Sequence, residues 1–213
     1  MTQGADLGRS VAHYRDLALR YDHRTRRINS IRERAMAALQ LRPGETVLDA
    51  GCGTGWCLRQ LADAVGRNGH AIGFDPSPEM LAIARELRVG GELAPRVELI
   101  EATAQEVRLP RPVDAILFSY THDVMRSREA LENLFAQARP GARVAATGTK
   151  LCARWLFPAN WYLRLSHRAY ITNFEGLDAP WSLLATMLDD FHVATGPFTP
   201  HYVATGRVRG QAA

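Results

Sequence analysis

The chain has 213 residues, of which 46% are hydrophobic and 23% are charged, and its formal net charge at pH 7 is +4. A chain of this length can bury about 70% of its unfolded surface in one domain, so a full hydrophobic core is expected. The opening residues lack the apolar run of a secretory signal, and no window approaches the ~18 apolar residues of a membrane span, which favours a cytoplasmic protein. The three cysteines match no zinc or disulfide spacing, which fits a reducing compartment, and no structural metal is expected.

The N-terminal segment is rich in arginine. Its apolar residues recur at three- and four-residue steps, which predicts an amphipathic helix. They are Ile28, Ile31, Ala35, Ala38 and Leu39. The arginines then lie mostly on the opposite, solvated face, and a surface for an anionic partner is the alternative.

Strand-like and helix-like segments alternate after this helix. A capping hydroxyl at Ser77, followed by a proline and an acidic residue, predicts the start of the helix that ends at Leu87. The predicted elements in chain order are a strand at 46–50, a helix at 56–65, a strand at 70–75, a helix at 77–87, strands at 96–101 and 113–120, a helix at 127–138, and a turn into a strand at 139–148.

The end of the chain departs from this alternation. A helix is predicted over 177–188, followed by two short strands at 191–198 and 201–208 that read as a hairpin. Strands separated by helices imply a parallel sheet that is covered on both faces. The fold class is therefore α/β, with a doubly wound, mostly parallel, seven-stranded Rossmann-like sheet and a C-terminal antiparallel hairpin.

The glycine-rich stretch "VLDAGCGTG" follows the first predicted strand. In open parallel sheets ligands bind beyond the carboxyl ends of the strands, so Gly51, Gly53 and Gly55 indicate a ligand against bare backbone. Dinucleotides and S-adenosylmethionine both use such a turn. The Gly-x-Gly-x-Gly spacing and Asp49, which would repel a pyrophosphate, favour S-adenosylmethionine. Asp75, at the end of the second strand, can hold a ribose in either class.

These motifs, with "AIGF" before Asp75 and "ARPGARVAATG", resemble the class I S-adenosylmethionine-dependent methyltransferases, particularly the small-molecule and quinone type. The resemblance implies that the Gly51–Gly55 backbone, with Cys52, lies along the methionine and ribose. It also places Asp49 near the amino group of the cofactor, Asp75 on the ribose and Pro76 beside the adenine.

One position departs from the family pattern. Ala102 stands where many members carry an aspartate that binds the adenine amino group. Thr103, Gln105 or a backbone carbonyl is then expected to take its place.

The fourth strand ends in "LFSYTHDVM", where the transferred methyl group is expected. Ser119 is predicted to contact the cofactor, and Tyr120 and Asp123 the acceptor. His122 is a candidate general base because its ordinary pKa is near neutrality. Alternatively His122 is a wall residue, and Asp123 or Ser127 caps the next helix. The stretch lacks the Asn/Asp-Pro-Pro-Tyr/Phe motif of enzymes that methylate adenine, so no nucleic-acid acceptor is expected.

Two aromatic segments are expected to cover the site. Tyr14 and Tyr21 lie two helical turns apart, and the resemblance implies a helix that closes over the cofactor with a tyrosine near the sulfonium; packing is the alternative. The long connection at 151–176 is predicted to be an acceptor lid that includes Trp161, Tyr170 and Asn173, with a rigid wall as the alternative.

A single methyltransferase domain is expected over 1–213. It comprises an N-terminal helical cap (1–40), a cofactor-binding core (41–150), the insertion (151–176) and a C-terminal helix and hairpin (177–213). The expected activity is methylation of an O or N atom of a small, partly apolar or aromatic molecule. The alternatives are a membrane-surface enzyme acting on a quinone or phospholipid headgroup, with weak membrane contact, and a cofactor-binding protein that transfers no methyl group.

Overall fold

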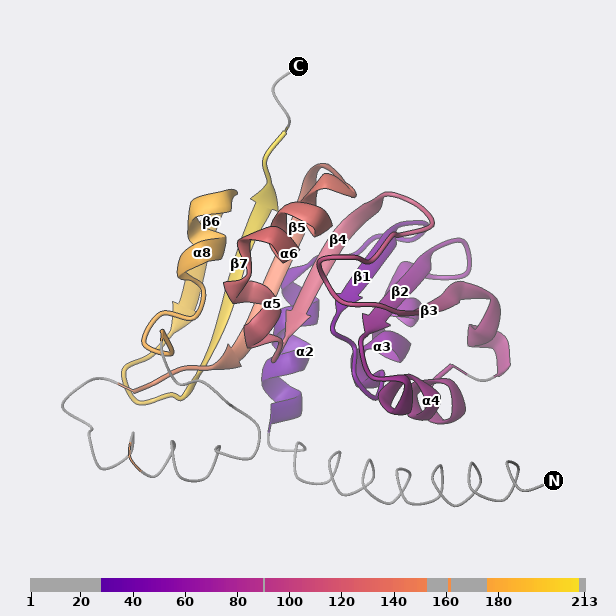
Figure 1. Cartoon of the computed structure of the whole chain (residues 1–213), viewed down its shortest axis with the longest axis horizontal. Helices are drawn as coiled ribbons and strands as arrows, with labels where there is room; N and C mark the ends of the chain where they lie inside the picture. The colour runs from indigo at the N-terminus through magenta and orange to yellow at the C-terminus, as the bar shows by residue number, and fades with distance from the viewer. Residues whose placement is uncertain (1–27, 90, 153–160, 162–175, 211–213) are drawn as a thin grey trace.

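The structure is a computed structural model that describes residues 28–89, 91–152, 161 and 176–210 (Figure 1). The described residues form a seven-stranded sheet with the order β3-β2-β1-β4-β5-β7-β6. Its strands are β1 (Thr46–Ala50), β2 (His70–Asp75), β3 (Val97–Glu101), β4 (Val113–Ser119), β5 (Ala138–Thr149), β6 (Leu188–Thr195) and β7 (His201–Val208).

The five strands from β1 to β5 are parallel to one another, and β7 is inserted antiparallel between β5 and β6. The order reverses between β1 and β4, since β1 leads outward to β2 and β3, while β4 continues toward β5. The predicted fold class, including the antiparallel C-terminal hairpin, is confirmed.

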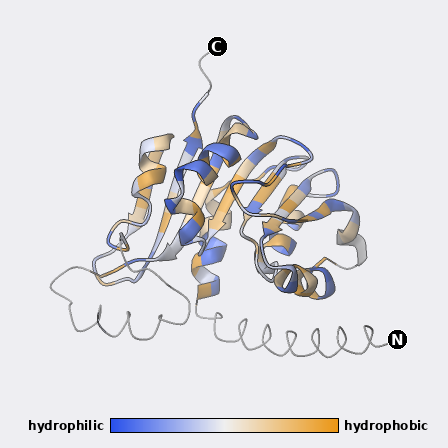
Figure 2. Cartoon of the chain, viewed as in Figure 1, coloured by the Kyte–Doolittle hydropathy of each residue, from blue (hydrophilic) through white to orange (hydrophobic). Residues whose placement is uncertain are grey.

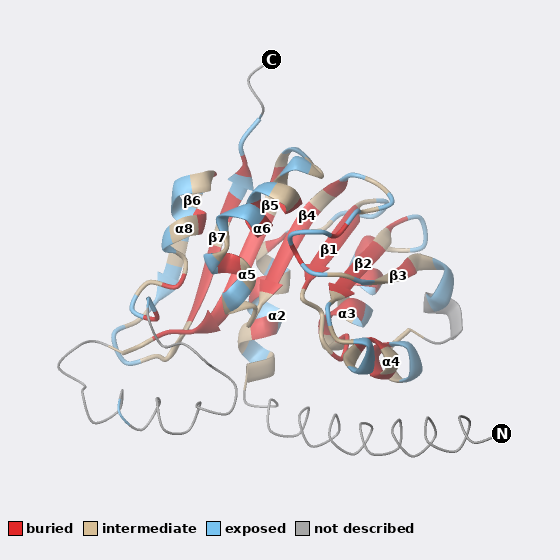
Figure 3. Cartoon of the chain, in the orientation of Figure 1, coloured by how far each residue is buried: buried red, intermediate tan, exposed pale blue. Residues whose placement is uncertain are grey.

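Helices cover both faces of the sheet. On one face α2 (Asn29–Ala38) and α3 (Trp56–Val65) pack with Val47, Leu117 and Val203. On the other face α5 (His122–Arg126), α6 (Arg128–Ala136) and α8 (Ser182–Met187) pack with the alternate strand residues, such as Leu48 and Phe118. Helix α4 (Pro78–Leu87) and the short 3-10 helix η2 (Gly91–Arg96) lie between β2 and β3 in the chain. Two apolar layers therefore enclose the sheet: β1, β2 and β4 are almost continuously buried and apolar, whereas the edge strand β6 is mostly exposed (Figures 2 and 3).

The predicted boundaries hold best around the glycine loop. Strand β1, helix α3 and strand β2 have the predicted limits, and Ser77 Oγ accepts the backbone N–H of Met80 to cap α4. Helix α5 was not predicted from the sequence. The helix predicted over 177–188 begins only at Ser182, because Pro180 disfavours helical backbone at the residue before it. No helix among the described residues is long and apolar enough to cross a membrane.

Candidate functional site

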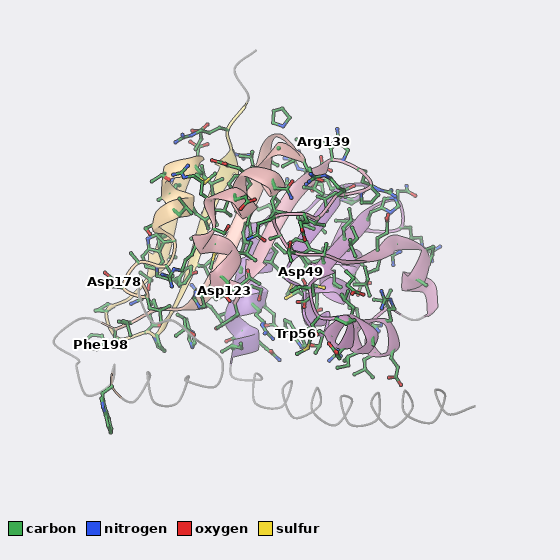
Figure 4. All side chains as sticks on the ribbon, in the orientation of Figure 1. Asp49, Trp56, Asp123, Arg139, Asp178 and Phe198 are labelled. Carbon is green, nitrogen blue, oxygen red and sulfur yellow. The ribbon has the colours of Figure 1, made fainter. Side chains whose placement is uncertain are left out.

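A cavity of about 430 Å³ opens at the carboxyl ends of β1, β2 and β4, where the strand order reverses. In Figure 4, Asp49 and Asp123 lie toward this end of the sheet, while Arg139, at the start of β5, lies at the other. The lining residues come from α2, from β1 with the loop after it and the start of α3, from the end of β2 with α4, and from the end of β4 with α5. They are Arg32, Asp49, Gly51, Cys52, Gly53, Thr54, Cys57, Asp75, Pro76, Ser77, Met80, Ser119, Tyr120, Thr121, His122, Asp123 and Val124.

The loop after β1 requires glycine for two separate reasons. Gly51 has φ +71°, and a Cβ there would lie 2.5 Å from Cγ2 of Thr121. Gly55, with φ +73°, precedes the first residue of α3 in a left-handed conformation, and its Cβ would meet Ala84 of α4 at 3.0 Å. Side chains are therefore excluded where the loop turns and where helices pack. The loop presents bare backbone to the cavity.

Asp75 ties this loop to the end of β2. Its Oδ2 accepts the backbone N–H of Gly53 at 2.9 Å, and its Oδ1 accepts that of Ser77 at 3.0 Å. Each carboxylate oxygen can accept more than one hydrogen bond, so both keep capacity toward the cavity.

Asp49 is a buried acid in the wall of the cavity, and its pKa is raised. It is 2% exposed and has the same strand parity as Val47, so it faces the layer of α2 and α3. Burial raises the pKa of Asp49 to about 7; the Arg32 guanidinium opposes this rise, and the Asp75 carboxylate adds to it. A cation that bound beside Asp49 would favour its ionised form.

Arg32 brings a buried positive charge to the same wall. It is 6% exposed, and its guanidinium carbon lies 5.3 Å from the ring centre of Trp56 and 5.5 Å from that of Tyr120. Its Nε and Nη1 are buried, and neither donates a hydrogen bond to any residue that the structure describes. Buried donors of this kind ordinarily have a partner, which makes Arg32 a candidate for binding an anion.

His122 packs against the end of β5. Its Nε2 accepts the backbone N–H of Thr149 at 3.3 Å, so in the neutral ring the proton is on Nδ1. Burial lowers the pKa of His122, Arg126 adds to this effect, and Asp123 opposes it. A Cβ on Gly148 would lie 2.8 Å from Cε1 of the ring. The nitrogen that a base would use is already engaged, so this arrangement supports the wall alternative for His122.

Tyr120 leaves β4 in a strained conformation. It is a non-glycine residue with φ +63°, and its backbone N–H donates to the carbonyl of Thr147 on β5 at 2.9 Å. Its hydroxyl lies 3.1 Å from Nδ1 of His201, the first residue of β7. The ring of Tyr120 thus lies beside Arg32 on one side, and its hydroxyl contacts His201 of β7, beyond β5, on the other.

The cavity brings together most of the predicted site residues that the structure describes. These are Asp49, Gly51, Cys52, Gly53, Asp75, Pro76, Ser119, Tyr120, His122 and Asp123. Three predicted cofactor residues do not line it: Gly55 supports the loop from behind, Ala102 packs against the core, and Thr103 Oγ1 donates to Glu106.

Most of the residues that were predicted to cover the site lie outside the part of the chain that the structure describes. Tyr14, Tyr21, Tyr170 and Asn173 lie outside the described residues. Trp161 is described and is 69% exposed, and it does not line the cavity.

Sequence reasoning missed several lining residues, of which Arg32 matters most. It was expected on the solvated face, yet it lies four residues after Ile28 and three before Ala35, which is the spacing of the buried face. The helical period was the signal that could have found it. Among the described residues no cluster of His, Cys, Asp and Glu could hold a metal ion.

Comparison with known proteins agrees with this geometry. Residues 47–141 match a family described as a methyltransferase domain. The chain is 32% identical over 129 residues to the demethylmenaquinone methyltransferase of Oceanobacillus iheyensis, a match that covers 58% of this chain and 52% of the relative. It is also 32% identical over 105 residues to the ubiquinone/menaquinone biosynthesis C-methyltransferase UbiE of Vibrio vulnificus, covering 48% of this chain and 40% of the relative. The chain thus spans about half the length of the curated relatives it matches, or less.

A solved structure shares the fold over most of the chain. The SAM-dependent methyltransferase from Aquifex aeolicus superposes with a TM-score of 0.56 at 23% identity, covering 83% of this chain and 88% of the other. This likeness concerns the fold alone.

Proposed function

Because residues 47–141 are a methyltransferase domain of the class I type, whose cofactor is S-adenosylmethionine, we propose that this protein methylates a ring carbon of a reduced quinone or a closely related small phenol. The observation that carries the proposal is the pair of opposite, buried charges of Asp49 and Arg32 beside a bare glycine loop. A zwitterionic amino acid is the ligand chemistry that suits such a wall.

The donor set fits S-adenosylmethionine group by group. We assign the amino group of its methionine part to Asp49 and the carboxylate to the two unpartnered donors of Arg32. The ribose hydroxyls go to Asp75, which retains acceptor capacity. The cofactor supplies an electrophilic methyl group on a sulfonium, so the protein has mainly to position the acceptor and exclude water.

The acceptor atom is proposed to be carbon, which differs from the O or N atom expected from sequence alone. Support comes from the UbiE relative, whose name specifies C-methylation. A quinol ring carbon beside a hydroxyl becomes nucleophilic when that hydroxyl loses its proton. The reaction therefore needs a proton acceptor near the end of β4, in addition to a positioned methyl group.

The test is an incubation of the purified chain with S-adenosylmethionine and 1,4-naphthohydroquinone kept reduced, followed by mass spectrometry and by proton NMR of the product, which distinguishes a methyl group on carbon from one on oxygen. The expected product carries one additional methyl group on carbon, and S-adenosylhomocysteine forms in equal amount. Oxidised 1,4-naphthoquinone, which lacks the nucleophilic ring, and a short RNA serve as control acceptors.

Two outcomes would contradict different parts of the proposal. Methylation of the naphthol oxygen, or of the RNA instead of the quinol, would overturn the acceptor assignment while leaving the methyltransferase intact. Failure to bind S-adenosylhomocysteine in a titration would overturn the cofactor site itself.

A further inference from the structure

The contact between Tyr120 and His201 is not explained by the cofactor site. Tyr120 Oη lies 3.1 Å from His201 Nδ1, and the two rings meet edge to face with their centres 6.2 Å apart. The residues come from β4 and β7, which lie on either side of β5. A phenol and an imidazole at this distance can exchange a proton.

The backbone of Tyr120 is held in a costly conformation that makes this contact. A left-handed residue other than glycine is energetically costly and persists only where its surroundings fix it. Here the bond from the Tyr120 N–H to the Thr147 carbonyl fixes it, while the side chain reaches across β5. Strain of this kind is concentrated at functional sites.

His201 is fixed just as firmly. It pairs with Thr149 in the antiparallel register of β5 and β7. Its backbone N–H donates to Thr199 Oγ1 at 3.2 Å, and its carbonyl accepts from Thr195 Oγ1 at 3.0 Å. The backbone that carries the imidazole is therefore anchored at the same end of the sheet as the cavity.

The position of the pair matches the acceptor side of the proposed reaction. The proposed ribose contact is at the end of β2, and the proposed amino-acid contacts are Asp49 of β1 and Arg32 of α2, so we place the acceptor beyond them, over the ends of β4, β5 and β7. Tyr120 stands at this boundary, since it lines the cavity and its ring lies 5.5 Å from the Arg32 guanidinium. His122 is nearby, but its Nε2 is engaged by Thr149.

We propose that Tyr120 and His201 form the proton relay for the acceptor, an inference that rests on the proposed function. The oxygen of Tyr120 takes the proton of the acceptor hydroxyl as the phenolic proton of Tyr120 moves to Nδ1 of His201. Tyr120 is then a catalytic residue, and His201 is a positioning residue that acts through it.

The step balances in atoms and charge. The ring carbon forms a bond to the methyl group as the sulfur–methyl bond breaks, and the electron pair of that bond stays on sulfur. The positive charge lost from the sulfonium reappears on the imidazolium of His201. The ring carbon then loses its hydrogen to water, the relay returns its proton to the ring oxygen, and one proton is released overall.

Two variants isolate the relay in the full chain. Tyr120→Phe keeps the ring beside Arg32 and removes only the hydroxyl, while His201→Asn keeps an acceptor oxygen but cannot take up a proton. His192→Asn, at an exposed histidine of the adjacent strand β6, is the matched control. The probes are reduced 1,4-naphthohydroquinone and 2-hydroxy-1,4-naphthoquinone, whose acidic hydroxyl is already ionised at neutral pH.

The expected result is a loss of about 100-fold or more in kcat for naphthohydroquinone in both relay variants, because positioned proton transfer contributes roughly 10²–10⁴-fold. The KM for the quinol and the affinity for S-adenosylhomocysteine should change by less than about threefold. With the ionised probe, which needs no base, the relay variants should stay within about fivefold of the wild type.

Three results would decide against the inference in distinguishable ways. An unchanged kcat in Tyr120→Phe overturns the relay alone. Equal losses with both probes show that the hydroxyl has a structural role, and also overturn it. A wild-type chain that binds S-adenosylhomocysteine but methylates neither probe overturns the proposed function, and the relay with it.

Discussion

The backbone N–H of Gly53 donates to Oδ2 of Asp75 at 2.9 Å, so the carboxylate at the end of β2 also fixes the loop after β1. Replacing Asp75 by alanine should therefore remove both a proposed ribose contact and the anchor of the loop. We expect the affinity for S-adenosylhomocysteine to fall by about 1.5–3 kcal/mol, the range for hydrogen bonds to a charged group. Calorimetry measures it, with Asp63→Ala on the exposed side of α3 as the control. Unchanged affinity would show that the ribose is held elsewhere.

Arg32→Met should weaken binding only of ligands that carry the amino acid. We expect S-adenosylhomocysteine to lose about 1.5–3 kcal/mol of binding free energy, because its carboxylate loses a charged partner. 5′-Methylthioadenosine, which has the same nucleoside and no carboxylate, should bind the variant as it binds the wild type. Arg34→Met, at an exposed position of the same helix, is the control. An equal loss for the two ligands would mean that Arg32 only supports the fold.

Binding of S-adenosylhomocysteine should tighten as the pH rises through about 7. The pKa of Asp49 is raised to about 7 in the free protein, and the ammonium group of the ligand favours the ionised carboxylate, so binding releases a proton below this pH. Calorimetry in two buffers of different ionisation enthalpy measures the proton release. Asp49→Asn should bind more weakly and lose this pH dependence; a wild-type affinity that is flat from pH 5.5 to 8 would contradict the assignment.

The raised pKa of Asp49 also makes the free energy of unfolding depend on pH. Between pH 3.8, the ordinary pKa of an aspartate, and pH of about 7, the pKa of Asp49 in the folded protein, the folded state binds more protons than the unfolded state. The contribution of Asp49 to the free energy of unfolding therefore falls as the pH rises through this window and levels off above it. Denaturant titrations at a series of pH values give the free energy of unfolding. Its slope against pH should differ between the ligand-free wild type and Asp49→Asn over this range.

Gly148→Ala should destabilise the protein through His122. The added Cβ would lie 2.8 Å from Cε1 of the buried imidazole and 3.3 Å from the Tyr202 hydroxyl, and crowding of this kind costs typically about 1–3 kcal/mol. In a His122→Ala background the cost should be smaller by more than about 0.5 kcal/mol, as expected for residues in contact. Chemical denaturation measures both, with Gly210→Ala, where a Cβ meets nothing, as the control. Additive losses would show that His122 is not the obstacle.

The parts of the site that were predictable from sequence are those specified locally. Strand β1, the glycine loop, α3 and Asp75 lie in one continuous stretch whose apolar runs, glycines and cap each determine their own backbone. Arg32 was misplaced because its charge was given more weight than its helical position, although two aromatic rings and a nearby carboxylate make its burial tolerable.

The contact between Tyr120 and His201 could not be predicted from the sequence, for a different reason. It depends on β7 entering between β5 and β6 and on the register that sets His201 opposite Thr149. No local pattern encodes that register. His201 therefore carried no signal in the sequence, and Tyr120 was expected only to contact the acceptor.

The insertion of β7 between β5 and β6 also bears on the order in which the site is assembled during synthesis. The glycine loop and Asp75 precede His201 in the chain, so they leave the ribosome before His201 does. A nascent chain could thus form the proposed nucleoside contacts while β5 still lacks its neighbour β7. The proposed acceptor site, which includes His201, is complete only when β7 docks, so the proposed cofactor and acceptor contacts would form at separate moments of folding.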